Sequence, residues 1–245
     1  MAQSQLMAVE NKGRKNDGKA MSLKARAQRR LAITMTVLAA MLLSAGSLRF
    51  WQGWLFLILM SGFWTFFFID LLKHNPQLLE RRLESKETQP EQRLFQKLWS
   101  VISLPAFALA GLDFRFGWSR EWLGGVPMWL VAAGQVMAVA GYWLVFWVMK
   151  TNSFASTTIQ VETGQRVVRS GPYATVRHPM YSGMAVMALG TPLALGSYLA
   201  LPLFASLIPV LMFRLIHEER FLHHALPGYR EYCEQTRFRL IPFVW

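Results

Sequence analysis

The sequence predicts an all-α fold: a polytopic membrane helix bundle of about five to six helices, whose last two form a helical hairpin. Composition is the first reason, because 53% of the 245 residues are hydrophobic, only 16% are charged and the mean hydropathy is +0.25. Soluble domains carry roughly a quarter charged residues. The second reason is that apolar runs long enough to span a membrane recur along the chain. The third is that Lys and Arg gather in the segments between those runs.

Residues 1–30 are polar and basic and lack an apolar stripe, so they are expected to form a disordered cytoplasmic tail. A cleaved signal peptide is disfavoured, since the leader is long and two apolar runs follow in succession. Four transmembrane helices are expected within 31–149, and the apolar runs that predict them are 31–48, 51–72, 98–112 and 126–149. The run 98–112 is short, which predicts a tilted or partly interfacial helix.

The last apolar run, 181–216, is too long for one crossing. The turn-forming residues Gly196 to Tyr198, followed by Pro202, lie near its middle. This run is therefore expected to form a helical hairpin that returns to the surface where it began. The hairpin brings the expected number of helices to about six, with five as the alternative.

Loop charges predict the orientation of the bundle. With a cytoplasmic N-terminus, all but three of the 26 Lys and Arg residues fall in cytoplasmic segments, the exceptions being Arg49, Arg115 and Arg120. The positive-inside rule thus predicts cytoplasmic N- and C-termini. Because the basic residues are spread over four segments that flank spans, anionic membrane lipids are expected as partners and nucleic acid is not. Cys233 is the only cysteine, so no internal disulfide can form.

Segment 150–180 is more polar than the rest of the chain and contains turn signals at Gly164 and Gly171. It leads into the sequence Arg177-His178-Pro179-Met180-Tyr181. Proline is common at the first position of a helix, so a helix is expected to begin here, at the membrane surface. The unpaired N–H groups and positive dipole end of such a helix favour an anionic group such as a carboxylate.

The other end of the hairpin carries Arg214 and Glu218, which are four residues apart and share one helical face. A hairpin that returns to its starting surface brings them close to His178 and Tyr181. Taken singly, the arginines read as membrane anchors, the tyrosine as an interfacial aromatic and the histidine as a surface residue. The acidic pair Glu218–Glu219 is not explained in this way, because acidic side chains at the end of an apolar helix gain nothing from insertion and would face a negatively charged leaflet. No metal site is expected, since the other histidines lack suitable partners.

Short motifs follow one another in a fixed order through 150–245. They are Gln160-x-Glu162, Gln165-Arg166-Val167-Val168, Gly171-Pro172-Tyr173, Arg177-His178-Pro179-Met180-Tyr181, Glu218-Glu219, Tyr229-x-x-Tyr232 and Leu240-Ile241-Pro242. In this order they resemble the isoprenylcysteine carboxyl methyltransferase family of integral membrane enzymes, which use S-adenosylmethionine. The wider group includes phospholipid N-methyltransferases and bacterial thiol methyltransferases.

The resemblance implies that 150–245 is a catalytic region made of a cofactor loop, the hairpin and a C-terminal cap. It implies S-adenosylmethionine in a cytoplasmic pocket, a lipophilic acceptor that enters from the bilayer, and Arg214 as the residue that holds this acceptor. The implied cofactor contacts are Gln160, the strand-like Gln165, Arg166, Val167 and Val168, then Tyr173, His178, Pro179, Met180, Tyr181 and Glu218. Loop 226–229 departs from the family pattern and is about one residue shorter, which leaves the choice between Glu218 and Glu219 open.

The acceptor also stays open. A carboxylate is ionised at pH 7 and needs no general base, whereas an amine or thiol must lose a proton, for which His178 or Glu219 is the candidate. The resemblance favours a prenylcysteine-like or other lipophilic acid as the acceptor, with a phospholipid amine or a small thiol as alternatives. More distant alternatives are an NADPH-dependent sterol-type reductase and a non-enzymatic membrane scaffold.

Overall fold

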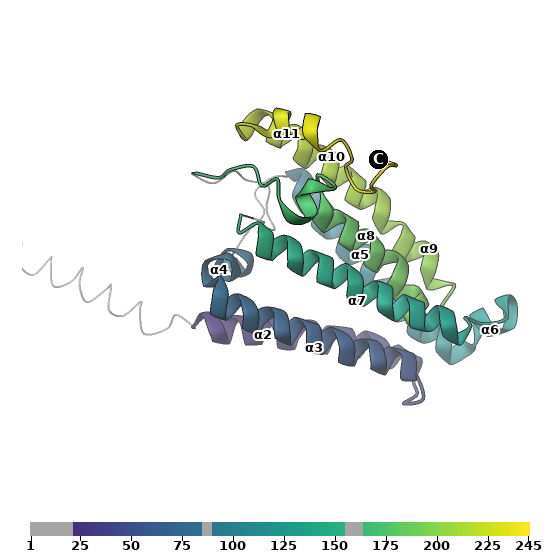
Figure 1. Ribbon diagram of the computed structural model, residues 1–245. Helices are drawn as coiled ribbons and strands as arrows, with labels where there is room; N and C mark the ends of the chain where they lie inside the picture. Colours follow the sequence, from purple (N-terminus) through teal and green to yellow (C-terminus); the bar gives the residue numbers. More distant parts are fainter. Residues whose placement is uncertain (1–21, 85–89, 155–163) are drawn as a thin grey trace, which may run out of the picture.

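The computed structural model describes residues 22–84, 90–154 and 164–245. All regular secondary structure in these ranges is helical, as predicted (Figure 1). The predicted tail up to residue 21, and Gln160, lie outside the described residues. The long helices of the bundle are α2 (Leu23–Leu42), α3 (Trp51–His74), α5 (Pro90–Phe116), α7 (Met128–Thr151), α8 (Pro179–Ala194) and the consecutive pair α9 (Ala200–Ala205) and α10 (Leu207–Ala225).

Four described segments are long and apolar enough to cross a membrane: Trp51–His74, Arg93–Phe116, Met128–Thr151 and Ala200–Ala225. The predicted multi-pass membrane bundle is therefore confirmed. The run 98–112, from which a tilted or partly interfacial helix is expected because it is short, lies within a longer helix: the polar residues that precede it continue the same helix and give α5 a length of 27 residues, of which Arg93–Phe116 is long and apolar enough to cross a membrane.

Helix α2 begins at Leu23, inside the segment that the sequence assigns to the basic tail. The reason is tertiary: Ala27 is only 1% exposed and packs in a core formed with residues of α3 and of α4 (Pro76–Glu84), while Arg26 pairs with Glu80 at 3.1 Å. Helix α2 is not among the four apolar spans, since its first two turns carry four basic residues.

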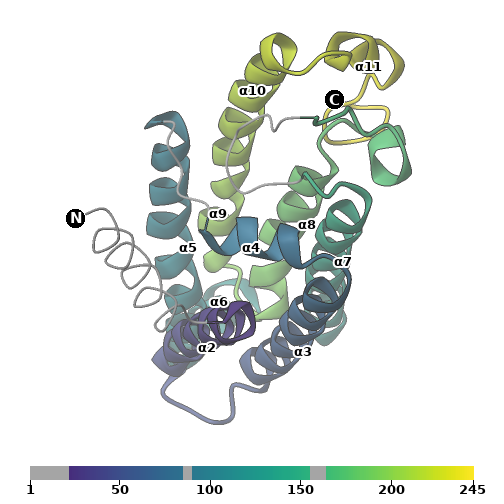
Figure 2. The same cartoon turned by 90° about the vertical axis from the view of Figure 1, so that its left-hand side faces the viewer.

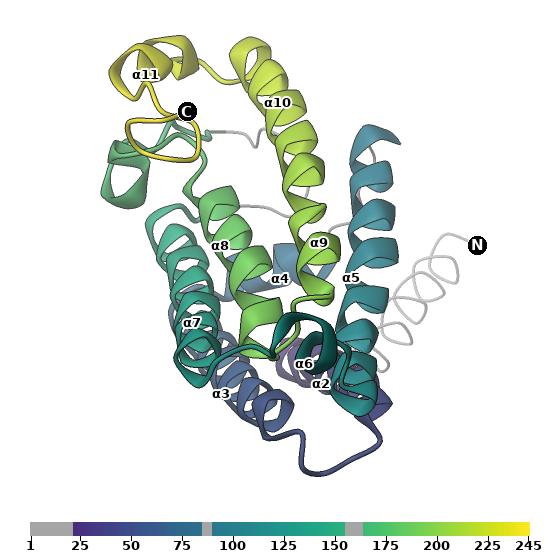
Figure 3. The ribbon, with the colours of Figure 1, turned by 90° about the vertical axis from the view of Figure 1, so that its right-hand side faces the viewer.

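The predicted hairpin is confirmed. Helix α8 ends at Ala194, the chain turns, and α9 and α10 return alongside it. Gly196 has φ = +70° in this turn, a conformation that glycine adopts without steric cost. The turn is fixed to α5 and to α6 (Trp118–Leu123), because Asp113 accepts hydrogen bonds from the Ser119 and Ser197 hydroxyls. Figure 3 shows α6 at this end of the bundle.

Helices α7 and α8 pack with their backbones in close contact. A Cβ atom on Gly141 would lie 2.6 Å from the carbonyl oxygen of Gly183, and one on Gly183 would lie 2.7 Å from that of Gly141. Only glycine therefore permits this approach. The close packing fixes the first turn of α8 relative to the loop that follows α7.

The end of the bundle away from α6 is more elaborate. Helix α4 crosses it between α5 and α7, and α11 (Tyr229–Gln235) lies beyond α10 (Figure 2). The C-terminal segment runs beside the start of α8: the backbone N–H groups of Arg177 and His178 donate to the carbonyls of Phe238 and Arg239 at 2.8 and 2.9 Å. Helix α4, the start of α8, helix α11 and the C-terminal segment, which are far apart in the sequence, therefore lie at the same end of the bundle.

Candidate functional site

A cavity of about 320 Å³ lies at this end, among α4, α5, α8, α10, α11 and the loop after α7. Most of the residues that the sequence singles out line it. They are Gln165, Arg166, Val167, Val168, Tyr173, His178, Pro179, Met180, Tyr181, Arg214 and Glu218. The segment 165–168, expected to be strand-like, forms no strand, because the described residues offer it no partner strand.

Tyr181 joins the two charged residues that the hairpin brings to the cavity. The Arg214 Nε–H donates to the Tyr181 hydroxyl at 2.8 Å, and that hydroxyl donates to the Glu218 carboxylate. Arg214 is only 7% exposed, and its guanidinium carbon lies 4.6 Å from the centre of the Phe95 ring. One phenol thus bonds both a cation and an anion of α10.

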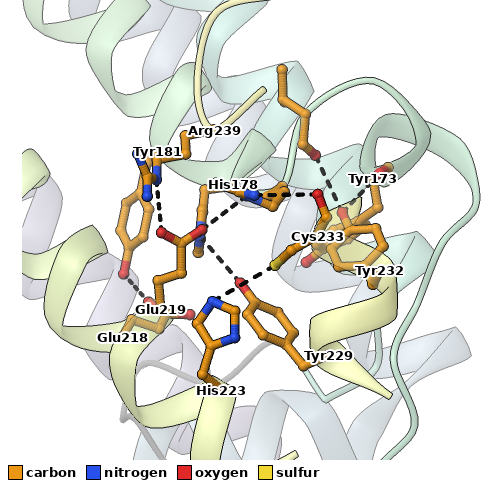
Figure 4. A network of polar contacts seen from close by, with 12 residues as sticks. Tyr173, His178, Tyr181, Glu218, Glu219, His223, Tyr229, Tyr232, Cys233 and Arg239 are labelled. Atoms are coloured by element: carbon orange, nitrogen blue, oxygen red, sulfur yellow. Dashed lines mark hydrogen bonds and ion pairs between the residues drawn. The ribbon is translucent and has the colours of Figure 1, made fainter. Parts of the chain in front are cut away.

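Glu219 has a different environment, shown in Figure 4. Its carboxylate lies 2.8 Å from Arg177 Nε, 2.7 Å from Arg239 Nε and 3.6 Å from His178 Nε2. It is buried and does not line the cavity, so the structure places Glu218 there instead. Because two guanidinium groups compensate its charge, Glu219 joins α10 to the start of α8 and to the C-terminal segment. This arrangement is unsuited to a general base.

The start of α8 is less open than the sequence suggests. The N–H of His178 is already bonded to Arg239, Pro179 has no N–H, and the N–H of Tyr181 donates to the His178 carbonyl at 3.0 Å. The amide of Met180 is the one left for an anion among these positions. His178 is 6% exposed, and its Nε2 lies 3.4 Å from the Tyr229 hydroxyl.

Tyrosines form much of the remaining wall. Tyr173, in the 3₁₀ turn Gly171–Ala174, accepts a hydrogen bond from Asn152 at 3.1 Å, and its carbonyl accepts one from the Tyr232 hydroxyl at 2.8 Å. Burial raises the pKa of Tyr173 to about 12 and also raises the pKa values of Tyr229 and Tyr232. All three phenols are therefore neutral at pH 7 and present aromatic faces together with hydroxyl groups.

Several lining residues are not predicted from the sequence. They are Arg82, Phe95, Gln96, Asn152, Phe154, Met184, Leu222 and Leu226. Arg82 is the charged residue in this list. In the sequence it follows Arg81, between the apolar runs 51–72 and 98–112, where both arginines simply indicate the orientation of the bundle. No feature of the sequence distinguishes the two. Within the described ranges, no group of three or more His, Cys, Asp or Glu side chains is arranged to hold a metal ion.

Residues 129–227 match the family model described as phospholipid methyltransferase. Delta(14)-sterol reductase TM7SF2 of Mus musculus is 34% identical over 93 residues, which are 36% of this chain and 22% of the reductase. The cobalt-zinc-cadmium resistance protein CzcN of Cupriavidus metallidurans is 30% identical over 145 residues, 57% of this chain and 60% of CzcN.

Among solved structures, the eukaryotic intramembrane Ras methyltransferase, isoprenylcysteine carboxyl methyltransferase, aligns with a TM-score of 0.49 and 18% identity, over 77% of this chain and 65% of the other. The chain spans less than two thirds of the length of each of these three proteins. His178, Tyr181 and Glu218, which line the cavity, lie within the segment that matches the phospholipid methyltransferase model, and this match confirms the resemblance to membrane methyltransferases for that part of the chain.

Proposed function

We propose that this protein is an integral membrane methyltransferase, with 150–245 as its catalytic region, that transfers a methyl group from S-adenosylmethionine to a lipophilic acceptor. The observation that carries the proposal is the convergence of Glu218, Tyr181 and the start of α8 in one cavity, within the family-matched segment and at the end of an apolar bundle. The loop charges favour a cytoplasmic location for this cavity and for both termini.

The lining residues fit the groups of S-adenosylmethionine, which supplies an electrophilic methyl group when bound. The Glu218 carboxylate suits its ammonium, and the faces of Tyr173 and Tyr229 suit a cation. The amide of Met180 suits its carboxylate, since it lies at a helix start. Val167, with its neighbour in the same loop, offers an apolar wall for adenine. Gln160, the remaining implied contact, lies outside the described residues.

The charge of the cavity favours an acceptor that is an acid. Among the described residues that line it, the arginines Arg82, Arg166, Arg177 and Arg214 outnumber the acidic residues, of which Glu218 is the one present; Arg177 also pairs with Glu219. This surplus of positive charge opposes a cationic amine and attracts an anion. Arg214 would orient the acceptor carboxylate through its guanidinium, which the Tyr181 bond and the Phe95 ring hold in place.

The reaction then needs no general base. An acceptor carboxylate oxygen forms a bond to the methyl carbon as the carbon–sulfur bond breaks, and the bonding pair stays on sulfur. The products are a methyl ester and a neutral thioether, and no proton moves. The protein's task is to position the two reactants. A phospholipid amine or small thiol acceptor would require a base, for which His178 is the candidate.

The test is calorimetric titration of the purified protein with S-adenosylmethionine and, separately, with NADPH. The second titration is informative because one of the compared relatives is a sterol reductase. We expect saturable S-adenosylmethionine binding and no NADPH binding. Absence of S-adenosylmethionine binding at high micromolar concentration would refute the proposal, and NADPH binding alone would support a reductase. Incubating membrane extracts with methyl-labelled cofactor then identifies the acceptor from the labelled product.

A further inference from the structure

A second cavity, of about 130 Å³, adjoins the candidate site at Arg82. Residues of α2, α3, α4 and α7 line it. Most of them are apolar, among them Trp64, Phe67, Leu79, Leu83 and Met149, and the polar ones are Arg30, Thr34 and Arg82. The Trp64 ring meets the Phe67 ring edge to face, with their centres 5.5 Å apart; Phe67 belongs to the buried core at this end of the bundle, and the partly buried Trp64 packs against that core. Such a lining suits an apolar ligand group.

Arg82 lines both cavities. Its Nη2 lies 3.9 Å from the Sδ of Met180, so the guanidinium reaches the first turn of α8 from α4. Burial lowers the pKa of Arg82 to about 10; Tyr173 opposes this effect and the charge of Arg214 adds to it. Arg82 therefore remains charged at pH 7, and an anion beside it would offset its repulsion from Arg214.

We propose that the second cavity takes the apolar tail of the methyl acceptor, and that Arg82, together with Arg214, binds the acceptor's anionic head group. This inference rests on the proposed function and specifies its substrate class: an acid whose single tail passes Arg82 and ends beside Trp64. Arg82 lies outside residues 129–227. A side chain that this chain contributes from α4 would thus determine acceptor specificity, in addition to the residues of the family segment.

The two parts of the ligand contribute differently. A tail that comes from the bilayer gains little by entering another apolar environment, because lipid and the cavity wall are similarly apolar. Affinity then depends mainly on the pairing of the head group with Arg82 and Arg214. Tail length is selected by shape, since the aromatic and aliphatic walls at Phe67 and Leu79 are buried and close-packed.

Trp64 provides a readout of binding that does not require turnover. The protein, reconstituted in lipid nanodiscs, is titrated with alkanoic acids that carry a bromine at the tail end, and tryptophan fluorescence is recorded. Bromine quenches an indole only at close contact. The signal of Trp64→Phe is subtracted, which removes quenching of the other nine tryptophans by probe in the bilayer. Bromoalkanols of equal length serve as uncharged probes.

We expect the acids to quench Trp64 at lower concentration than the alkanols. Arg82→Gln should weaken binding of the acids by about tenfold or more, because a charge-assisted bond is lost, and should leave binding of the alkanols unchanged. Arg82→Lys should retain part of the effect. Arg29→Gln is the matched control: it removes an exposed arginine from the same end of the bundle and should behave as the unchanged protein.

Leu83→Phe tests the cavity independently, since the larger ring fills it and should abolish the Trp64 signal of the longest acids. Equal quenching by acids and alkanols that Arg82→Gln does not alter would overturn the inference, as would full quenching in Leu83→Phe. S-adenosylmethionine titration of the same samples separates the two claims. Cofactor binding without Arg82-dependent quenching refutes this inference alone, whereas absence of cofactor binding refutes the proposed function.

Discussion

At the residue scale, the neighbouring residues Glu218 and Glu219 have different surroundings. Glu218 faces the cavity and accepts a bond from Tyr181, whereas Glu219, one position later, points to Arg177 and Arg239. Successive residues on a helix lie about 100° apart, so one turns toward a ligand space and the other toward protein. The sequence indicates an acidic pair, but which member faces the cavity depends on the rotation of α10, which tertiary packing determines.

This difference leads to a test of the cofactor site. Glu218→Ala and His178→Ala should each weaken S-adenosylmethionine binding by about tenfold or more, because a charged or polar contact is lost in a buried site. Arg214→Ala should leave that affinity nearly unchanged and lower kcat, since this residue is proposed to hold the acceptor. Binding is measured by calorimetry and kcat by methyl transfer. Glu231→Ala, an exposed acidic residue of α11, is the control. Unchanged affinity in both of the first two variants would contradict the site.

Glu219 should instead affect stability. Glu219→Ala leaves Arg177, whose side chain is only 10% exposed, without its carboxylate. Removal of one member of a buried ion pair costs about 3–5 kcal/mol, so the melting temperature is expected to fall markedly. Thermal unfolding in detergent measures this effect. A double variant, Glu219→Ala with Arg177→Ala, should recover part of the loss, because it also removes the buried charge that is left unpaired. A Glu219→Ala protein that melts like the unchanged chain would show that this ion pair does not stabilise the fold.

At the scale of elements, the apolar runs locate α3 and α7 within a few residues, and the turn residues near Gly196 locate the hairpin. Hydropathy is sufficient for these because lipid exposure selects apolar side chains all around the helix. It is not sufficient for the start of α2, since residues 23–30 carry four basic side chains and are held at the bundle by the buried Ala27 and by the pair of Arg26 with Glu80. Nor does it identify α4 as a wall of the cavity.

The α7–α8 contact provides a test at this scale. Gly141→Ala should destabilise the protein, because its Cβ would meet the carbonyl oxygen of Gly183 at 2.6 Å and the two helices would have to separate. Gly62→Ala, in the middle of α3, is the matched control, since no atom lies within 4 Å of the position that its new methyl group would take. This control should be neutral or stabilising by about 0.5–1 kcal/mol, the usual gain of alanine over glycine in a helix. Equal melting temperatures for the two variants would contradict the importance of this contact.

At the scale of the whole molecule, the two ends differ in both charge and shape. The end with the cavities carries Arg82, Arg166 and Arg214, whereas the α6 end is closed by the buried Asp113 network. The sequence predicts the asymmetry of charge, because Lys and Arg can be sorted by the runs that they flank. It does not predict that some of these charges enclose a cavity, since that requires α4, α5, α8 and α10 to be placed in three dimensions.

Orientation can be measured because the chain has a single cysteine. Burial raises the pKa of Cys233, so this thiol should react slowly and is best replaced by serine. In the Cys233→Ser background, Glu231→Cys places a thiol at the cavity end and Leu48→Cys places one at the α6 end, where Leu48 is 81% exposed. If the positive-inside rule holds, a membrane-impermeant maleimide added to intact cells should label Leu48→Cys, and added to inverted vesicles it should label Glu231→Cys. The reverse pattern would place the cavity, and therefore the proposed methyl transfer, on the opposite side of the membrane.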